Sequence, residues 1–249
     1  MTNQPPLTGF KRDVVIFLQK LILVLARAWY FVALMAAVTF LALAFLAPAF
    51  MASDQPGAGR TIYALLAPHN HQLPQRSYFV FGVKGGIQTY SLAQLLAFGA
   101  EADNPEAFLG NADIGYKTGL NHRMVAIFSG LCLGGLIWGL AGGRPRLRLI
   151  PFLLMTLPLF IDGLSHMSSD GGAGFREENE WAVIITGGLF PAPFYAGTII
   201  GTLDWLLRTA TGLLFGLGLA WFLFTYLSNR FAAIRRELEP KLRRAGAIK

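Results

Sequence analysis

The sequence predicts an all-α integral membrane protein with about four transmembrane helices, an N-terminal interfacial helix, a C-terminal basic amphipathic helix and two long outer loops. Of the 249 residues, 54% are hydrophobic and only 14% are charged, whereas a soluble domain carries about 25% charged residues. Aromatic residues make up 13% of the chain, which suits a protein with aromatic belts at the membrane interfaces. Four almost uncharged runs are long enough to cross a hydrocarbon core of about 30 Å.

These four runs are the predicted spans. The first has no charged residue, and with a rise of about 1.5 Å per residue it crosses the core with some tilt. The third contains Pro158 and carries Asp162 near one end. Glycines recur in the second and fourth runs, for example at Gly130, Gly212 and Gly216, and this spacing predicts close contacts between helices. The spans are residues 28–50, 124–142, 149–165 and 209–227.

The distribution of charge predicts the orientation. If both termini and the loop with Arg144, Arg146 and Arg148 are cytoplasmic, that side holds four, three and seven basic residues, together 14 of the 21 Lys and Arg. It then holds only 3 of the 14 acidic residues. A basic excess marks the cytoplasmic side, so we expect a multi-pass protein of the cell membrane with both termini in the cytoplasm.

Residues 181–203 are also uncharged and long enough to cross. A crossing there would place the basic tail on the opposite side, and Pro191, Pro193 and four glycines would break the helix. We expect a re-entrant or interface-lying excursion, with a fifth span as the alternative.

We expect the chain to have three parts. They are an N-terminal segment (1–27), a four-span domain (28–227, with outer loops 51–121 and 166–207) and a basic tail (228–249). A polar stripe on one face predicts a cytoplasmic interfacial helix before the first span, and the apolar region is too long for a cleaved signal peptide. The tail predicts an amphipathic helix against anionic inner-leaflet lipids. The stripe consists of Arg12, Gln19, Lys20 and Arg27.

The sequence of the first outer loop predicts some regular secondary structure. Residues 78–83 and 87–90 could form a hairpin around Lys84, Gly85 and Gly86. Short helices are expected from Ser91 and around 103–109, with Asp103 as N-cap.

Ionisable residues gather in the outer loops and at the outer ends of the spans. Such groups are costly near a membrane unless they are paired, and their usual role is functional. The His-x-His and Asp-x-x-x-His spacings could bind a metal, with zinc as the first candidate, and a haem or chlorin magnesium is an alternative. The alternative for the carboxylates is structural ion pairing. The metal candidates are His69, His71, His122, Asp162 and His166, and the ion-pair candidates are Arg76, Arg123, Asp162, Asp204 and Arg208.

Four short motifs follow one another along the chain. The first is the run at 70–79, Asn-His-Gln-Leu-Pro-Gln-Arg-Ser-Tyr-Phe, which resembles the Cys-His-Gln…Arg-Ser-Phe segment of the uncharacterised membrane family called domain of unknown function 2085. The motifs at 121–123, 158–163 and 208–216 follow in order, so the resemblance extends over about 62–222. Asn70 and Asn121 stand where the family has Cys, and Met124 stands at another such position. The segment around 177–202 looks additional.

The resemblance implies a compact helical membrane unit without a known activity, and the missing cysteines imply that thiol chemistry is absent. Cys132 is the one cysteine of the chain, so neither an internal disulfide nor a Cys-based metal site can form. No basic and aromatic patch of a nucleic-acid module is present.

Three functions follow as hypotheses. The first is a non-catalytic accessory subunit of a larger membrane complex, with respiratory and photosynthetic complexes as candidates, because no catalytic motif is complete. Its partners would be other membrane subunits and lipids, with lipid or pigment at the bundle surface. The second is a metal-binding membrane enzyme, and the third is a small transporter.

Overall fold

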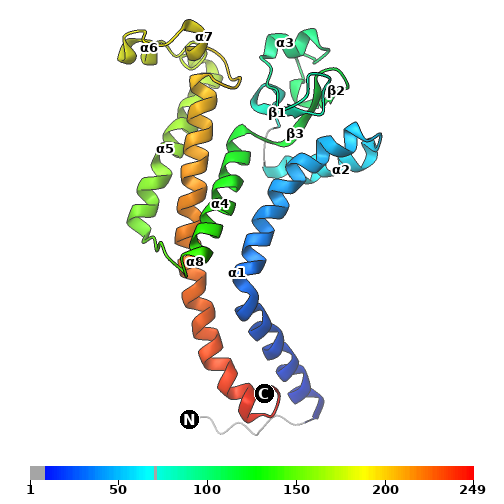
Figure 1. Ribbon diagram of the computed structural model, residues 1–249, viewed down its shortest axis with the longest axis vertical. Coiled ribbons are helices and arrows are strands. Elements are labelled where there is room, and N and C mark those ends of the chain that lie inside the picture. Colours follow the sequence, from blue (N-terminus) through cyan, green and yellow to red (C-terminus); the bar gives the residue numbers. More distant parts are fainter. Residues whose placement is uncertain (1–8, 70–71) are drawn as a thin grey trace.

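Four long helices dominate the computed structural model, which describes residues 9–69 and 72–249. They are α1 (Gly9–Ala52), α4 (His122–Leu140), α5 (Leu149–Ser168) and α8 (Leu203–Arg244). Each is long and apolar enough to cross a membrane, as the sequence predicts. Figure 1 shows the start of α1 and the C-terminus at one end of the long axis and a small sheet at the other. We call the sheet end the outer end and the other the inner end.

The N-terminal interfacial helix is not a separate element. Residues 9–52 form a single helix of 44 residues, about 66 Å long at 1.5 Å per residue. The chain from Phe10 to Ala47 contains neither Gly nor Pro, so nothing in it ends the helix. The expected break before the first span is therefore wrong, and α1 is longer than the span requires.

The predicted C-terminal amphipathic helix likewise continues the fourth span. α8 runs for 42 residues from a Thr202 N-cap to Arg244. Its last turns pack beside the start of α1, where Leu23 and Leu242 are buried and Arg27 pairs with Glu239 at 2.9 Å. We call residues 9–28 and 229–244 the paired extension. It lies beyond the inner end of α4, because Trp29 of α1 already contacts Trp138 in the last turn of α4.

Glycines bring α4 and α8 into close contact, as their spacing predicts. A Cβ atom on Gly130 would collide with the carbonyl oxygen of Leu213, and one on Gly216 would collide with that of Ile127. Backbone therefore packs against backbone along this interface. α5 packs on another side of α8, where the rings of Phe152 and Phe222 stack 4.6 Å apart. α1 packs on α4 through Phe40 and Phe128.

The first outer loop contains a three-stranded sheet, so the fold is not all-α throughout. Its antiparallel strands have the order β1-β3-β2. A small core of Phe79, Tyr90, Leu95, Ala100 and Ile114 lies against it. The elements are α2 (Pro56–Leu66), the 3₁₀ turns Ala67–His69, Pro74–Arg76 and Pro105–Ala107, the strands β1 (Ser77–Val80), β2 (Gly110–Asn111) and β3 (Gly115–Asn121), and α3 (Leu92–Ala97).

The expected hairpin is mostly replaced by a longer-range pairing. β1 pairs with β3, with Ser77 opposite Asn121, while residues 87–90 contribute one bridge between Phe79 and Gln88. β3 offers a longer paired edge, and its residues are mostly buried. The helix expected from Ser91 is present with a capping box between Ser91 and Gln94. Near 103–109 there is a 3₁₀ turn whose N-cap is Asn104 rather than Asp103.

Residues 181–203 do not form a fifth span. After the π-helical turn Ser169–Ala173 come only two short helices, α6 (Glu180–Thr186) and α7 (Ala192–Tyr195). Gly187 and Gly188 have φ of 63° and 69°, and Pro191 follows, so the helix ends there. The segment stays at the outer end (Figure 1).

Candidate functional site

A cluster of buried charged side chains lies at the outer end, where α4, α5 and α8 meet the outer loops. α4, α5 and α8 each supply their residues from the end nearest the sheet, so topology places them at one depth. We call this set the outer polar cluster. It consists of Arg76, Arg123, Asp162, His166, Arg176, Asp204 and Arg208.

Two carboxylates organise the cluster. Asp162 accepts from Arg123 Nη2 at 2.6 Å and from Arg176 Nη2 at 2.9 Å. Asp204 lies 2.9 Å from the same Nη2 of Arg176. Asp162, Asp204 and Arg176 are at most 6% exposed. Ions buried this deeply persist only when they are paired and hydrogen-bonded, so Arg176 ties the second outer loop to α5 and α8.

His166 lies between two arginines. Its Nδ1 is 3.1 Å from Arg208 Nη2, and its Nε2 is 2.9 Å from Arg176 Nη2. A neutral imidazole has one acceptor nitrogen, so only one of these contacts is a hydrogen bond that His166 accepts. Nε2 also lies 3.7 Å from both Asp162 Oδ1 and Asp204 Oδ1. With its proton on Nδ1 the imidazole accepts from Arg176 through Nε2, and with its proton on Nε2 it accepts from Arg208 through Nδ1.

Arg208 differs from the other arginines of the cluster. Arg76 pairs with Asp170 at 2.7 Å, and Arg123 and Arg176 pair with Asp162. Among the described residues, no carboxylate lies within 4.0 Å of Arg208, although it is only 3% exposed. The cluster therefore holds one buried guanidinium without an acidic partner.

The predicted metal ligands are only partly visible. His71 lies outside the described residues, and the side chain of His69 is not described. His122 is buried against the Tyr78 ring, with centroids 4.3 Å apart. Within 9–69 and 72–249, no group of three or more His, Cys, Asp or Glu is arranged to hold a metal ion. The metal site stays a prediction.

Three cluster partners were not anticipated from the sequence. Arg176 precedes the run Glu177-Glu178-Asn179-Glu180, which resembles a solvated surface segment. Asp170 binds Arg76, and the fully buried Asn179 donates to Asp204 and to the Tyr195 carbonyl. Asn179 has a φ of 47°, a left-handed conformation that Asn tolerates better than most residues. The sequence offers one signal for Arg176, which is that it follows the helix whose outer end carries Asp162 and His166.

A further buried cation lies in the sheet. Lys117 is fully buried, and its Nζ donates to the carbonyl oxygens of Gln72 and Glu106 at 2.8 and 2.6 Å. Desolvation lowers the pKa of Lys117 to about 8, against a smaller opposing effect of Glu106. Lys117 thus joins β3 to the preceding loop through carbonyl oxygens.

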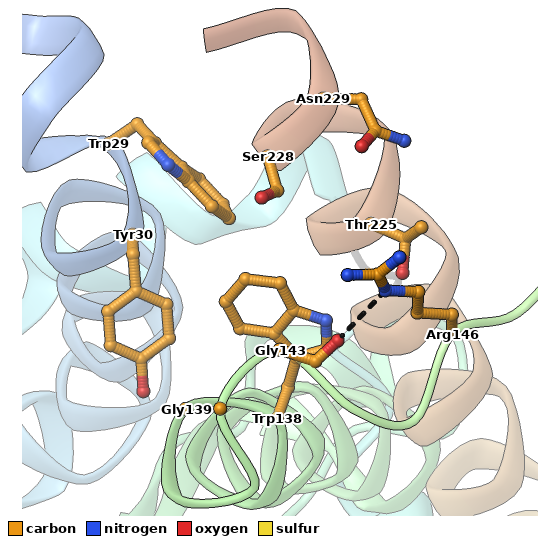
Figure 2. Close-up of a pocket in the computed structure, with 10 residues that line it drawn as sticks. Trp29, Tyr30, Trp138, Gly139, Gly143, Arg146, Thr225, Ser228 and Asn229 are labelled. Atoms are coloured by element: carbon orange, nitrogen blue, oxygen red, sulfur yellow. Dashed lines mark hydrogen bonds between the residues drawn. The ribbon is translucent and has the colours of Figure 1, made fainter. Parts of the chain in front are cut away.

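The inner end has an aromatic pocket of about 380 Å³ between α1, α4 and α8. Figure 2 shows the rings of Trp29, Tyr30 and Trp138 beside Ser228 and Asn229 of α8. Arg146 is held at its edge by a contact of 3.4 Å from Nε to the Gly143 carbonyl. The sequence-based expectation of lipid or pigment at the bundle surface stays a prediction for this pocket.

Comparison with known proteins gives one match. No curated protein and no solved structure matches the chain. One family model matches residues 114–203, a range that contains α4, α5 and residues 177–202, the segment expected to be an addition. Two of the four motifs that carry the resemblance, 121–123 and 158–163, lie inside the range, and those at 70–79 and 208–216 lie outside it. Residues 114–203 thus match the family described as "Predicted membrane protein (DUF2085)".

Proposed function

We propose that this chain is a non-catalytic accessory subunit of a larger membrane complex. The observation that carries the proposal is an uncovered apolar face on the paired extension. The respiratory or photosynthetic character of the complex, and the cytoplasmic position of both termini, stay predictions from the sequence.

Large apolar side chains of α1 are exposed along this extension. Phe17 is 64% exposed, Leu21 57% and Val24 60%, and Phe10 at the tip is 82% exposed. Their spacings of three, four and seven residues place Phe17, Leu21 and Val24 on one side of the helix. This is the pattern by which an amphipathic helix anchors in the groove of a partner protein.

The charge of the neighbouring helix argues against burial of the extension in hydrocarbon. The last turns of α8 run beside this part of α1 and carry basic and acidic side chains, which are costly in a bilayer core. The extension also lies beyond the end of α4, where Arg144, Arg146 and Arg148 follow. An uncovered apolar face outside the bilayer marks an interaction surface. The charged residues are Arg230, Arg235, Arg236, Glu237, Glu239, Lys241, Arg243 and Arg244.

The outer polar cluster supports a structural role in place of a catalytic one. Asp162 and Asp204 are both engaged by Arg176, and Asp162 also by Arg123. Carboxylates held in this way orient the ends of α4, α5 and α8. This agrees with a subunit whose work is to bind neighbours.

The test is to isolate the protein from its native membrane in mild detergent and to identify co-purifying subunits by mass spectrometry. The double variant Phe17→Glu/Leu21→Glu places two charges on the proposed face and should lose the partner. Ala233→Glu adds an acid at an exposed position of α8 in the same extension and should retain it. A photo-crosslinking residue at Val24 should label protein.

Three results would overturn the proposal: a wild-type monomer without partners, retention of the partner by the double variant, or crosslinks to lipid alone. Metal analysis of the same sample addresses the alternative function. One metal ion per chain, lost in His166→Ala, would favour the metal-binding enzyme.

A further inference from the structure

Among the residues that the structure describes, a small cavity at the outer end is lined by arginines and by no acidic residue. It has a volume of about 110 Å³ and is bounded by Leu73, Arg76, Asn121, Arg123, His166 and Arg208. A cavity needs about 10–15 Å³ to hold one water molecule, so this one has room for several water molecules or for a small anion. The larger neighbouring cavity, about 330 Å³, is bounded also by Asp170, Glu177 and Asp204. The larger cavity shares Arg76, His166 and Arg208 with the small one, and the described lining of the small cavity carries only positive charge.

Arg208 provides the deepest charge of that wall. Its only hydrogen-bond partner among the described residues is His166, and its Nη1 is buried without a partner. Leaving a desolvated guanidinium without a direct counter-charge is costly. Asp204 and Asp162 act on Arg208 only from beyond salt-bridge distance, and an anion in the cavity would supply a charge in direct contact.

The other arginines of the wall also have unused donors. The Nε groups of Arg76 and Arg123 are buried and unpaired within the described part of the chain, while their Nη2 groups hold Asp170 and Asp162. The carboxylates therefore fix the two guanidiniums without using all of their N–H groups. Both side chains are partly exposed, at 22% and 25%, whereas Arg208 is buried.

Helix geometry adds to the positive potential. The cavity lies at the N-terminal end of α4, where Asn121 is the N-cap and Arg123 is in the first turn. The N-terminus of a helix presents free N–H groups and the positive end of the helix dipole, which together favour anions. The 19 residues of α4 make this a full-length helix.

We propose that the Arg76–Arg123–Arg208 cavity binds a phosphate group, carried either by a phospholipid head group or by free inorganic phosphate. Guanidinium groups match the geometry of phosphate oxygens, and three of them surround a space of the right size. The cavity lies where the apolar helices end, at the depth expected for lipid head groups. This inference does not depend on the proposed function as a subunit.

The experiment uses the full chain, purified in mild detergent and freed of lipid. Inorganic phosphate is titrated by calorimetry at constant ionic strength, with chloride as the balancing anion. In parallel, native mass spectrometry follows binding of phosphatidylglycerol and of a diacylglycerol with the same acyl chains. The variants are Arg208→Gln and Arg76→Gln, and the control is Arg60→Gln, an exposed arginine of α2.

We expect one ligand per chain and a loss of affinity of about tenfold or more in Arg76→Gln, since a charge-assisted hydrogen bond to phosphate is removed. Arg60→Gln should bind as the wild type does. Saturation by inorganic phosphate identifies the free anion, and retention of phosphatidylglycerol without a phosphate response identifies the head group. Arg76 is partly exposed, so Arg76→Gln remains informative if Arg208→Gln does not fold. Absence of both ligands, equal binding of diacylglycerol, or unchanged binding by Arg76→Gln would overturn the proposal.

Discussion

At the outer end of the bundle, α4, α5 and α8 meet through charged side chains, whereas further in, α1, α4 and α8 meet through glycines and aromatic rings. Asp162 receives two arginines within 2.9 Å at the outer end. At the inner end the Trp138 ring lies 5.5 Å from that of Trp29 and 5.9 Å from that of Phe224. α4 and α8 thus take part in two different kinds of contact along their length.

The two kinds of contact differ in the cost of substituting one of the two residues that meet. A buried ion whose partner is lost stays in a low-dielectric site, and the cost exceeds what the pair contributed. A substitution at a glycine contact leaves no unpaired charge behind. Its cost arises from the volume that the new side chain adds. We therefore expect single substitutions to act more strongly at the outer end than along the α4–α8 interface.

The largest effect should come from Asp162→Asn. The change removes the charge that neutralises Arg123 and Arg176, and it leaves Arg176 with Asp204 alone. Breaking a buried pair from one side typically costs about 3–5 kcal/mol. Reversible unfolding in mixed micelles would measure the free energy of unfolding.

Asp170→Asn is the matched control for that substitution. Asp170 also binds an arginine, Arg76, but its side chain is 50% exposed. Pairs in contact with water contribute about 1 kcal/mol or less, so this variant should stay close to the wild type. Equal losses of unfolding free energy in the two variants would mean that burial does not determine how much each ion pair of the outer polar cluster stabilises the fold.

The next effect concerns Lys117, a buried cation held by carbonyl oxygens instead of carboxylates. Its folded pKa of about 8 lies below the ordinary value of about 10.4 for an unfolded chain. Between these values the unfolded chain holds a proton that the folded chain has lost, so this group makes stability rise with pH. The gain from pH 8 to pH 10.5 is at most about 3 kcal/mol.

Lys117→Met isolates this contribution, because other groups that titrate in the same range act on both proteins. The free energy of unfolding of wild type and variant would be compared at pH 7.5 and pH 10. The difference between them should shift in favour of the wild type as the pH rises. A difference that is independent of pH would show that Lys117 keeps its proton in the fold.

Prediction from the sequence is accurate here where a single periodic signal determines the structure of a segment. Hydropathy locates the four long helices, and the glycine spacing identifies Gly130 and Gly216 as positions of contact between helices, because both signals act within one helix; which helices meet there comes from the structure. It fails at helix ends that no Gly or Pro marks, and so α1 and α8 are longer than expected. The pairing of Ser77 with Asn121 and the position of Arg176 depend on chain segments far apart in sequence, which local patterns do not encode.

The smallest effect of the three should come from Gly216→Ala, in the interface that glycine spacing predicts. Its Cβ would meet the carbonyl oxygen of Ile127 and lie 2.8 Å from the backbone nitrogen of Leu131. Backbone atoms cannot rotate away, so α4 and α8 must separate slightly, at a cost of about 1–3 kcal/mol. Gly57→Ala is the control, because nothing lies within 4 Å of its added Cβ. Since alanine also favours the helix α2 by up to about 1 kcal/mol, Gly57→Ala should be neutral or stabilising, and a loss of stability there equal to that of Gly216→Ala would remove close packing as the reason for the glycines.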